Sequence, residues 1–180
     1  MADLERDWAG RERVFRLTFG DVLDLEEACD STLGSIFDRL SQGGFGAKDI
    51  VHTIRLALIG GGMDQLDAKR LVIERFELGG ALAMASLAVD VLISIMDGVE
   101  VTETPPEGVT KARFRFSEVS QVCREFSMSP QDLRALRYAD FCNLVRGFNA
   151  GAKGDKVEPP SEEEFEAMLA RDAARGVGDE

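Results

Sequence analysis

Apolar and polar positions change their spacing early in the chain. Residues 13–17 read RVFRL, in which charged and apolar side chains alternate, and the Ala9-Gly10 pair before them can turn the chain back from residues 4–8. Alternation of this kind is typical of strands, whereas the positions that follow recur with a helical period. We therefore predict a small amino-terminal β-hairpin followed by helices.

Capping residues and glycines set the limits of the first predicted helices. Thr18 with Asp21 three residues later resembles a capping box and predicts a helix over residues 19–28. Apolar residues at i, i+3, i+4 and i+7 predict a second helix, which starts after Ser31 or Thr32 and stops at the glycine pair 43–44.

Two more helices surround a run of three glycines. A third helix is predicted over residues 47–59 and ends at Gly60, Gly61 and Gly62. The triple glycine is not read as a phosphate loop, because no strand precedes it and no Gly-Lys-Ser/Thr follows it. A fourth helix begins at Asp64 or Asp67 and runs toward the glycine pair 79–80.

The stretch from Leu78 to Gly98, LGGALAMASLAVDVLISIMDG, is apolar almost throughout. A membrane span is disfavoured because Asp90 would lie near its centre and no cluster of Lys or Arg flanks it. A soluble helix of this kind is either buried in the middle of a domain or covered by another protein, and a symmetric contact between identical subunits is a third use. If a partner covers it, the contact residues are Leu82, Met84, Leu87, Val91, Leu92, Ile95 and Met96.

The second half of the chain is predicted to be helical in two places. Residues 99–112 contain Pro105-Pro106 and several carboxylates, which favours a linker. A helix is predicted over residues 114–126, and Ser129-Pro130 starts another whose apolar positions continue through Gly147.

The last thirty residues are strongly acidic. The run Ser161-Glu162-Glu163-Glu164 predicts a final helix that ends near Ala174. A solvated surface explains such acidity, but an acidic arm that docks on a basic partner would use its few apolar side chains as anchors. Those side chains are Phe165, Met168 and Leu169.

These elements together predict a mainly α fold, with an N-terminal β-hairpin on a helical bundle and a smaller C-terminal helical extension. The predicted divisions are a main domain over residues 1–98, a linker over 99–112, the extension over 113–149 and an acidic tail with a short helix over 150–180.

Charge and composition narrow the function. The 21 basic and 33 acidic residues leave a net charge of -12, which repels a phosphate backbone and argues against nucleic acid as a partner. His52 is the only histidine, and neither it nor the three cysteines has the spacing of a nucleophile or metal site. We expect no catalytic residues, cofactor or metal, and hence no enzyme. The odd number of cysteines and the lack of a leader pattern at the start predict a reduced, cytoplasmic protein.

Two stretches resemble a known family. RVFRLTFGDVLDLEEACDSTLGSIFDRL, followed by DIVHTIRLALIGGG, is similar to the first part of the tail assembly chaperones of siphophages and gene transfer agents, in which a short strand pair leads into an "L-T-F-G-x-L-x-x-L-E-E" helix. FRFSEVSQVCREFSMSPQDLRALRYADFCNLVRGFN resembles the downstream region of that family. The two stretches cover most of residues 13–149.

The resemblance implies a non-catalytic assembly factor in the cytoplasm of the host cell, absent from the mature particle. Its implied partners are the tape measure protein, whose apolar helices it would cover, and the tail tube protein, which it would help recruit. Many relatives separate the two regions by a programmed frameshift, whereas here both lie in one reading frame. The sequence therefore leaves open whether a shorter product exists, as it does the oligomeric state, the tape measure segment that is bound and the trigger for release.

Two other classes of function stay open. A structural tail component, such as a tube or terminator subunit, generally needs a β-rich body, and this chain has few strand candidates beyond the hairpin. A helix-turn-helix regulator would use residues 117–146 and read DNA with Arg134 and Arg137, but the surrounding acidity disfavours contacts with phosphate.

Overall fold

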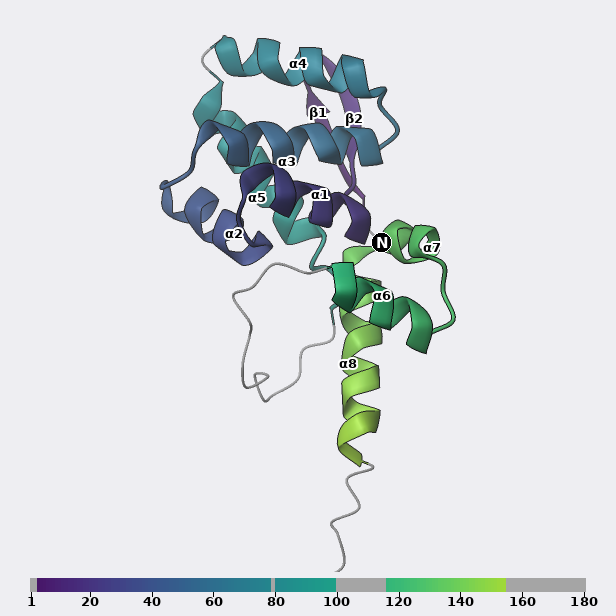
Figure 1. Cartoon of the computed structure of the whole chain (residues 1–180). Helices are drawn as coiled ribbons and strands as arrows, with labels where there is room; N and C mark the ends of the chain where they lie inside the picture. The colour runs from purple at the N-terminus through teal and green to yellow at the C-terminus, as the bar shows by residue number, and fades with distance from the viewer. Residues whose placement is uncertain (1–2, 79, 100–115, 155–180) are drawn as a thin grey trace, which may run out of the picture. The chain divides into compact units, whose positions relative to one another are not determined.

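The computed structural model describes residues 3–78, 80–99 and 116–154, with side chains placed except in 116–119 and 149–154. Two strands come first, β1 (Leu4–Trp8) and β2 (Arg11–Phe15), followed by α1 (Phe19–Cys29), α2 (Leu33–Gln42), α3 (Ala47–Gly60), α4 (Gln65–Glu77) and α5 (Ala81–Ser94). After the gap come α6 (Phe116–Glu125), α7 (Pro130–Ala135) and α8 (Tyr138–Gly154). The predicted fold class, a hairpin on a helical bundle with a smaller helical part behind it, is confirmed (Figure 1).

The chain forms two compact units, residues 1–146 and residues 147–180. Of the second unit, only the end of α8 is described. The predicted linker at 99–112 lies outside the described residues from residue 100 onward, as does the acidic tail from residue 155. The division of the chain at 98, 112 and 149 therefore stays a prediction.

Local signals fix most element ends as the sequence predicts. Thr18 caps α1 with a full capping box to Asp21, Thr32 caps α2, and Asp64 caps α4 through two backbone amides. The hairpin turns at Ala9 and Gly10, which both have positive φ, and it aligns Leu4 with Phe15. This alignment places Leu4, Trp8 and Phe15 on one face, which packs on the helices.

Helix α3 lies at the centre of the first unit. It packs against α1, α4, α5 and β2, and Figure 1 shows it between α4 and α1, with α5 crossing behind. Its Ile50, Ile54 and Leu58 are buried almost completely, in a core to which every element from β1 to α5 contributes. Helix α3 also buries Thr53, Leu56 and Ala57, so more than one of its sides packs against neighbouring elements.

The triple glycine does more than end α3. The amide of Arg16 donates to the carbonyl of Ala57 over 2.9 Å, so the end of β2 lies directly on the last turn of α3. A Cβ at Gly61 would lie 1.9 Å from the carbonyl oxygen of Val14, and one at Gly60 would lie 2.3 Å from that of Arg16. Glycine is therefore required here for close backbone contact.

A partly buried ion pair joins the end of α2 to the start of α3. The guanidinium of Arg39 donates to both oxygens of Asp49, over 2.9 and 2.6 Å, and the amide of Gly46 donates to the same carboxylate. Burial alone would raise the pKa of Asp49, but the hydrogen bonds from Arg39 and Gly46 outweigh it and hold the pKa below its ordinary value. The pair therefore favours the charged carboxylate in the folded state.

The helices after the gap share a small second core with the start of α1. Phe19, Cys123, Leu133 and Phe141 are buried together, and the rings of Phe19 and Phe141 stack with their centroids 3.7 Å apart. On the surface of the same contact, Arg134 donates to the carboxylate of Asp24 over 2.7 Å. Helices α6 to α8 are thus attached to the start of α1.

The prediction of one continuous helix from Ser129-Pro130 through Gly147 is wrong. Leu136 has an extended backbone, and its carbonyl accepts a hydrogen bond of 2.8 Å from the amide of Phe19. Arg137 then pairs with Thr18 in an isolated bridge. These contacts with α1 break the helix into α7 and α8, and periodicity within the segment gives no sign of them.

We expect Gly61→Ala to lower the free energy of unfolding by about 2–3 kcal/mol, because the new methyl group overlaps the backbone of β2 and the strand must move. Urea denaturation measures the change. Gly34→Ala is the matched control, since a Cβ at Gly34 meets nothing within 4 Å, and its stability should be unchanged or slightly higher. Equal stability of both variants would contradict the close contact.

We expect Asp49→Asn to cost about 2 kcal/mol at neutral pH, because Arg39 loses its charged partner. The lowered pKa of Asp49 gives stability that is present above the ordinary carboxyl pKa and is lost as pH falls through the folded-state pKa. The difference in unfolding free energy between the two proteins should therefore shrink as the pH is lowered from 7 to below 4. A constant difference across this range would show that the carboxylate charge is not involved.

Candidate functional site

The outer face of α5 carries large apolar side chains that are exposed to solvent. We define this α5 outer face as Leu82, Ser86, Val89, Ile93 and Met96, which recur every three or four residues; Val89 is partly buried and packs against the core. Leu82 is 77% exposed, Ile93 54% and Met96 47%, with Met96 in the turn after the helix. Solvent-facing helix positions are normally polar, so this face is a candidate for binding another protein.

The opposite side of α5 is core. Of the contact residues predicted from the sequence, Met84, Leu87, Val91, Leu92 and Ile95 are buried against the rest of the bundle. Leu82 and Met96 are the two residues of that set that lie on the surface. The helix therefore has a core side and an uncovered side. Binding by any of these residues stays a prediction.

The remaining predicted contact residues are Phe165, Met168 and Leu169, which lie outside the described residues. Ile93 is a surface residue that the sequence prediction left out. Its position, i+7 from Ser86 and i+11 from Leu82, could have identified it, but only once the buried side of the helix was known.

Asp90 lies at the edge of the α5 outer face and is paired. Arg6 of β1 donates to its carboxylate over 2.5 Å, and both side chains are partly exposed. The pair joins the hairpin to α5 across 84 residues of sequence.

Within the described ranges, no helix combines the length and the apolar character needed to cross a bilayer.

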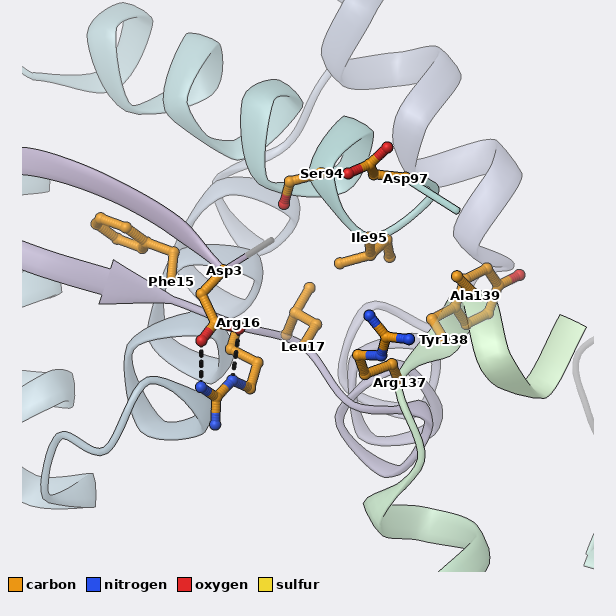
Figure 2. Close-up of a pocket in the computed structure, with 10 residues that line it drawn as sticks. All are labelled: Asp3, Phe15, Arg16, Leu17, Ser94, Ile95, Asp97, Arg137, Tyr138 and Ala139. Carbon is orange, nitrogen blue, oxygen red and sulfur yellow. Dashed lines mark hydrogen bonds and ion pairs between the residues drawn. The ribbon is translucent and has the colours of Figure 1, made fainter. Parts of the chain in front are cut away.

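A small pocket lies where the end of β2, the end of α5 and the start of α8 meet. Figure 2 shows Arg16 bonded to Asp3 on one side of it and Arg137 on the other. Its cavity volume of about 30 Å³ holds roughly two water molecules. The hydrogen bond from Arg16 lowers the pKa of Asp3, and Arg137 binds Asp140, so these charges form structural pairs. The pocket is too small for a substrate.

His52 and Cys29, two titratable groups considered in the sequence, both have shifted pKa values. Burial, together with Arg55 and Lys48, lowers the pKa of His52. Burial raises the pKa of the Cys29 thiol to about 11, which disfavours the nucleophilic thiolate. Among the residues with described positions, no group of three or more His, Cys, Asp or Glu side chains is arranged to hold a metal ion.

Arg134 and Arg137, the residues that a DNA-reading helix would use, are engaged within the chain. Arg134 donates to Asp24 and to the carbonyl of Gly20, and Arg137 makes two hydrogen bonds to Asp140. A phosphate would have to compete with these carboxylates.

Comparison with known proteins gives a match to a protein family. The family described as phage tail tube protein, GTA-gp10, matches residues 2–98, which span the hairpin and α1 to α5. No curated protein and no solved structure matches the chain. The match confirms the expected relationship to tail proteins of phages and gene transfer agents, but its description names a tail tube protein and not an assembly chaperone. Since it spans more than half of the chain, the protein belongs to the phage tail tube protein, GTA-gp10, family.

Proposed function

We propose that this protein is a structural component of a phage-type or gene transfer agent tail, and that it works by contact with the tail tube. The observation that carries the proposal is the family match over residues 2–98. That range coincides with the part of the chain in which the hairpin and five helices share one core. The matched segment therefore has a hydrophobic core of its own, and we call it the family module.

The shape of this module limits how it could join a tube. The described residues contain one two-stranded sheet, and its strands are five residues long. So small a sheet supplies little of a continuous β-wall, for which several longer strands are needed. We therefore place the protein beside the tube or at its end, where a helical surface makes the contact. The α5 outer face provides apolar area for that purpose.

We also propose a non-catalytic role. The described polar clusters are ion pairs that join neighbouring elements, such as Arg39 with Asp49 and Arg6 with Asp90. The pocket in Figure 2 holds a few water molecules at most. A role in binding other tail proteins accounts for these features, and no substrate site is needed to explain them.

A tail assembly chaperone is the second candidate. It is favoured by the helical build and by the uncovered apolar side chains on α5, which suit transient contact with the apolar helices of a tape measure protein. In that role the protein would act in the host cytoplasm, help recruit tail tube subunits and leave before the particle is complete.

Quantitative mass spectrometry of purified tails distinguishes the two candidates. With the gene expressed beside its neighbouring tail genes, we expect the protein in finished tails at a fixed ratio to the tube subunit, because a structural component stays in the assembly. A tail protein already placed in the particle serves as the internal reference.

The producing cells provide the control measurement. A protein that is abundant in the cell lysate, required for tail formation and missing from finished tails would reject the structural role and support the chaperone. Retention of the tape measure protein on the purified chain would strengthen that second result.

A further inference from the structure

The side of the hairpin that faces the helices carries cations. Antiparallel pairing sets Arg11 opposite Trp8, and Arg13 lies two residues further along the same strand. Residues opposite each other, and residues two apart in a strand, project to the same side of a sheet, so both arginines share the side of Trp8. Trp8 packs against the core of the bundle, which makes this the inner side of the hairpin.

Arg75 of α4 joins these two arginines. It lies in the last turn of its helix, and Figure 1 shows the strands of the hairpin extending to α4. Burial lowers the pKa of Arg13, and the positive charges of Arg11 and Arg75 lower it further. The three guanidinium groups therefore lie within electrostatic range of one another, and we call these three residues the arginine cluster.

No carboxylate within the described ranges forms an ion pair with the arginine cluster. Arg13 donates through its Nε to the carbonyl of Trp8 over 3.0 Å, and the Nε of Arg75 is buried without a hydrogen-bond partner. Other arginines of the described chain do have carboxylate partners, namely Arg6, Arg16, Arg39, Arg134 and Arg137. Unpaired cations are thus gathered at one place in a chain with a net charge of -12. Their mutual repulsion would be relieved by a bound anion.

The chemistry of the arginine cluster fits carboxylates. A guanidinium group donates two parallel hydrogen bonds to the oxygens of a carboxylate or a phosphate. The net charge of -12 disfavours a nucleic acid, which brings an unbroken row of phosphates, whereas a short peptide brings only a few charges. Trp8 is partly buried opposite Arg11, so an aromatic ring lies beside the cations and can contact an apolar residue of a peptide.

We propose that the arginine cluster binds an acidic peptide segment of another protein, whose carboxylates pair with Arg11, Arg13 and Arg75. The cluster contains no residue of the α5 outer face, so this site can be tested separately from the proposed function. Because the pairing is electrostatic and lies near the surface, binding weakens as the salt concentration rises.

Fluorescence of Trp8 measures the binding, because Trp8 is the only tryptophan of the chain and lies opposite Arg11. We expect a saturable change when the full chain is titrated with a synthetic peptide that contains three glutamates and one phenylalanine. The same peptide with glutamines in place of the glutamates should give no such change. Arg11→Gln combined with Arg75→Gln should weaken binding at least about tenfold, since two charge-assisted pairs are lost.

Lys69→Gln combined with Arg70→Gln is the matched control. It removes the same charge from exposed positions of α4, and the affinity should change less than about twofold. Circular dichroism checks that both double variants stay folded. A wild-type chain without a saturable change would overturn the proposal, and so would an equal loss of affinity in the control, because net charge alone would then attract the peptide. Tighter binding of a single-stranded DNA with the same number of charges would reject the peptide and assign the cluster to phosphates.

Discussion

The direct backbone contact between β2 and the last turn of α3 is the constraint on which the rest of the fold depends. The hydrogen bond from Arg16 to Ala57 holds the end of the hairpin against α3, and Gly60 and Gly61 remove the side chains that would keep them apart. The chain leaves this contact at Leu17 and enters α1 immediately. The direction of α1, and with it the surface that α7 and α8 contact, follows from where β2 lies on α3.

The two sides of α5 have different surroundings, since the inner side is buried in the bundle and the outer side is exposed. Burial of its inner side stabilises the bundle, and each fully buried aliphatic side chain contributes about 1.5–3 kcal/mol relative to exposure. On the outer side, Leu82 and Ile93 are large apolar residues that stay exposed. Exposed apolar area lowers solubility unless something covers it, which is why this side of α5 is a candidate for binding another protein.

Helices α6 to α8 lie outside residues 2–98, the range that matches the family, and pack against that range. They contact α1 through the stacked rings of Phe19 and Phe141 and through the ion pair of Arg134 with Asp24, and Asn143 donates to the carbonyl of Gly98 over 2.8 Å. Phe19 is thus fully buried by residues more than a hundred positions away. A member of the family that lacked these helices would expose Phe19. The start of α1 is therefore buried when α6 to α8 are present and apolar and exposed when they are absent.

The sequence by itself determined the hairpin, the cap of α1 and the helix ends at glycine, and it narrowed the caps of α2 and α4 to two candidates each, because these depend on side-chain and backbone chemistry within a few residues. It also predicted that α5 is covered by protein, which the structure shows for its inner side. It could not determine which side of α5 faces the core, since a helix that is apolar almost all round has no periodic signal to orient it. For the same reason it placed Met84 and Leu87 in a binding set although the fold buries them.

The tertiary structure alone decided the break between α7 and α8, the partner of Asp90 and the close contact at Gly61. Each depends on atoms far apart in the chain: the amide of Phe19 for Leu136, the guanidinium of Arg6 for Asp90 and the carbonyl of Val14 for Gly61. Local patterns carry no information about such neighbours, because which groups meet is fixed only when the helices pack against one another.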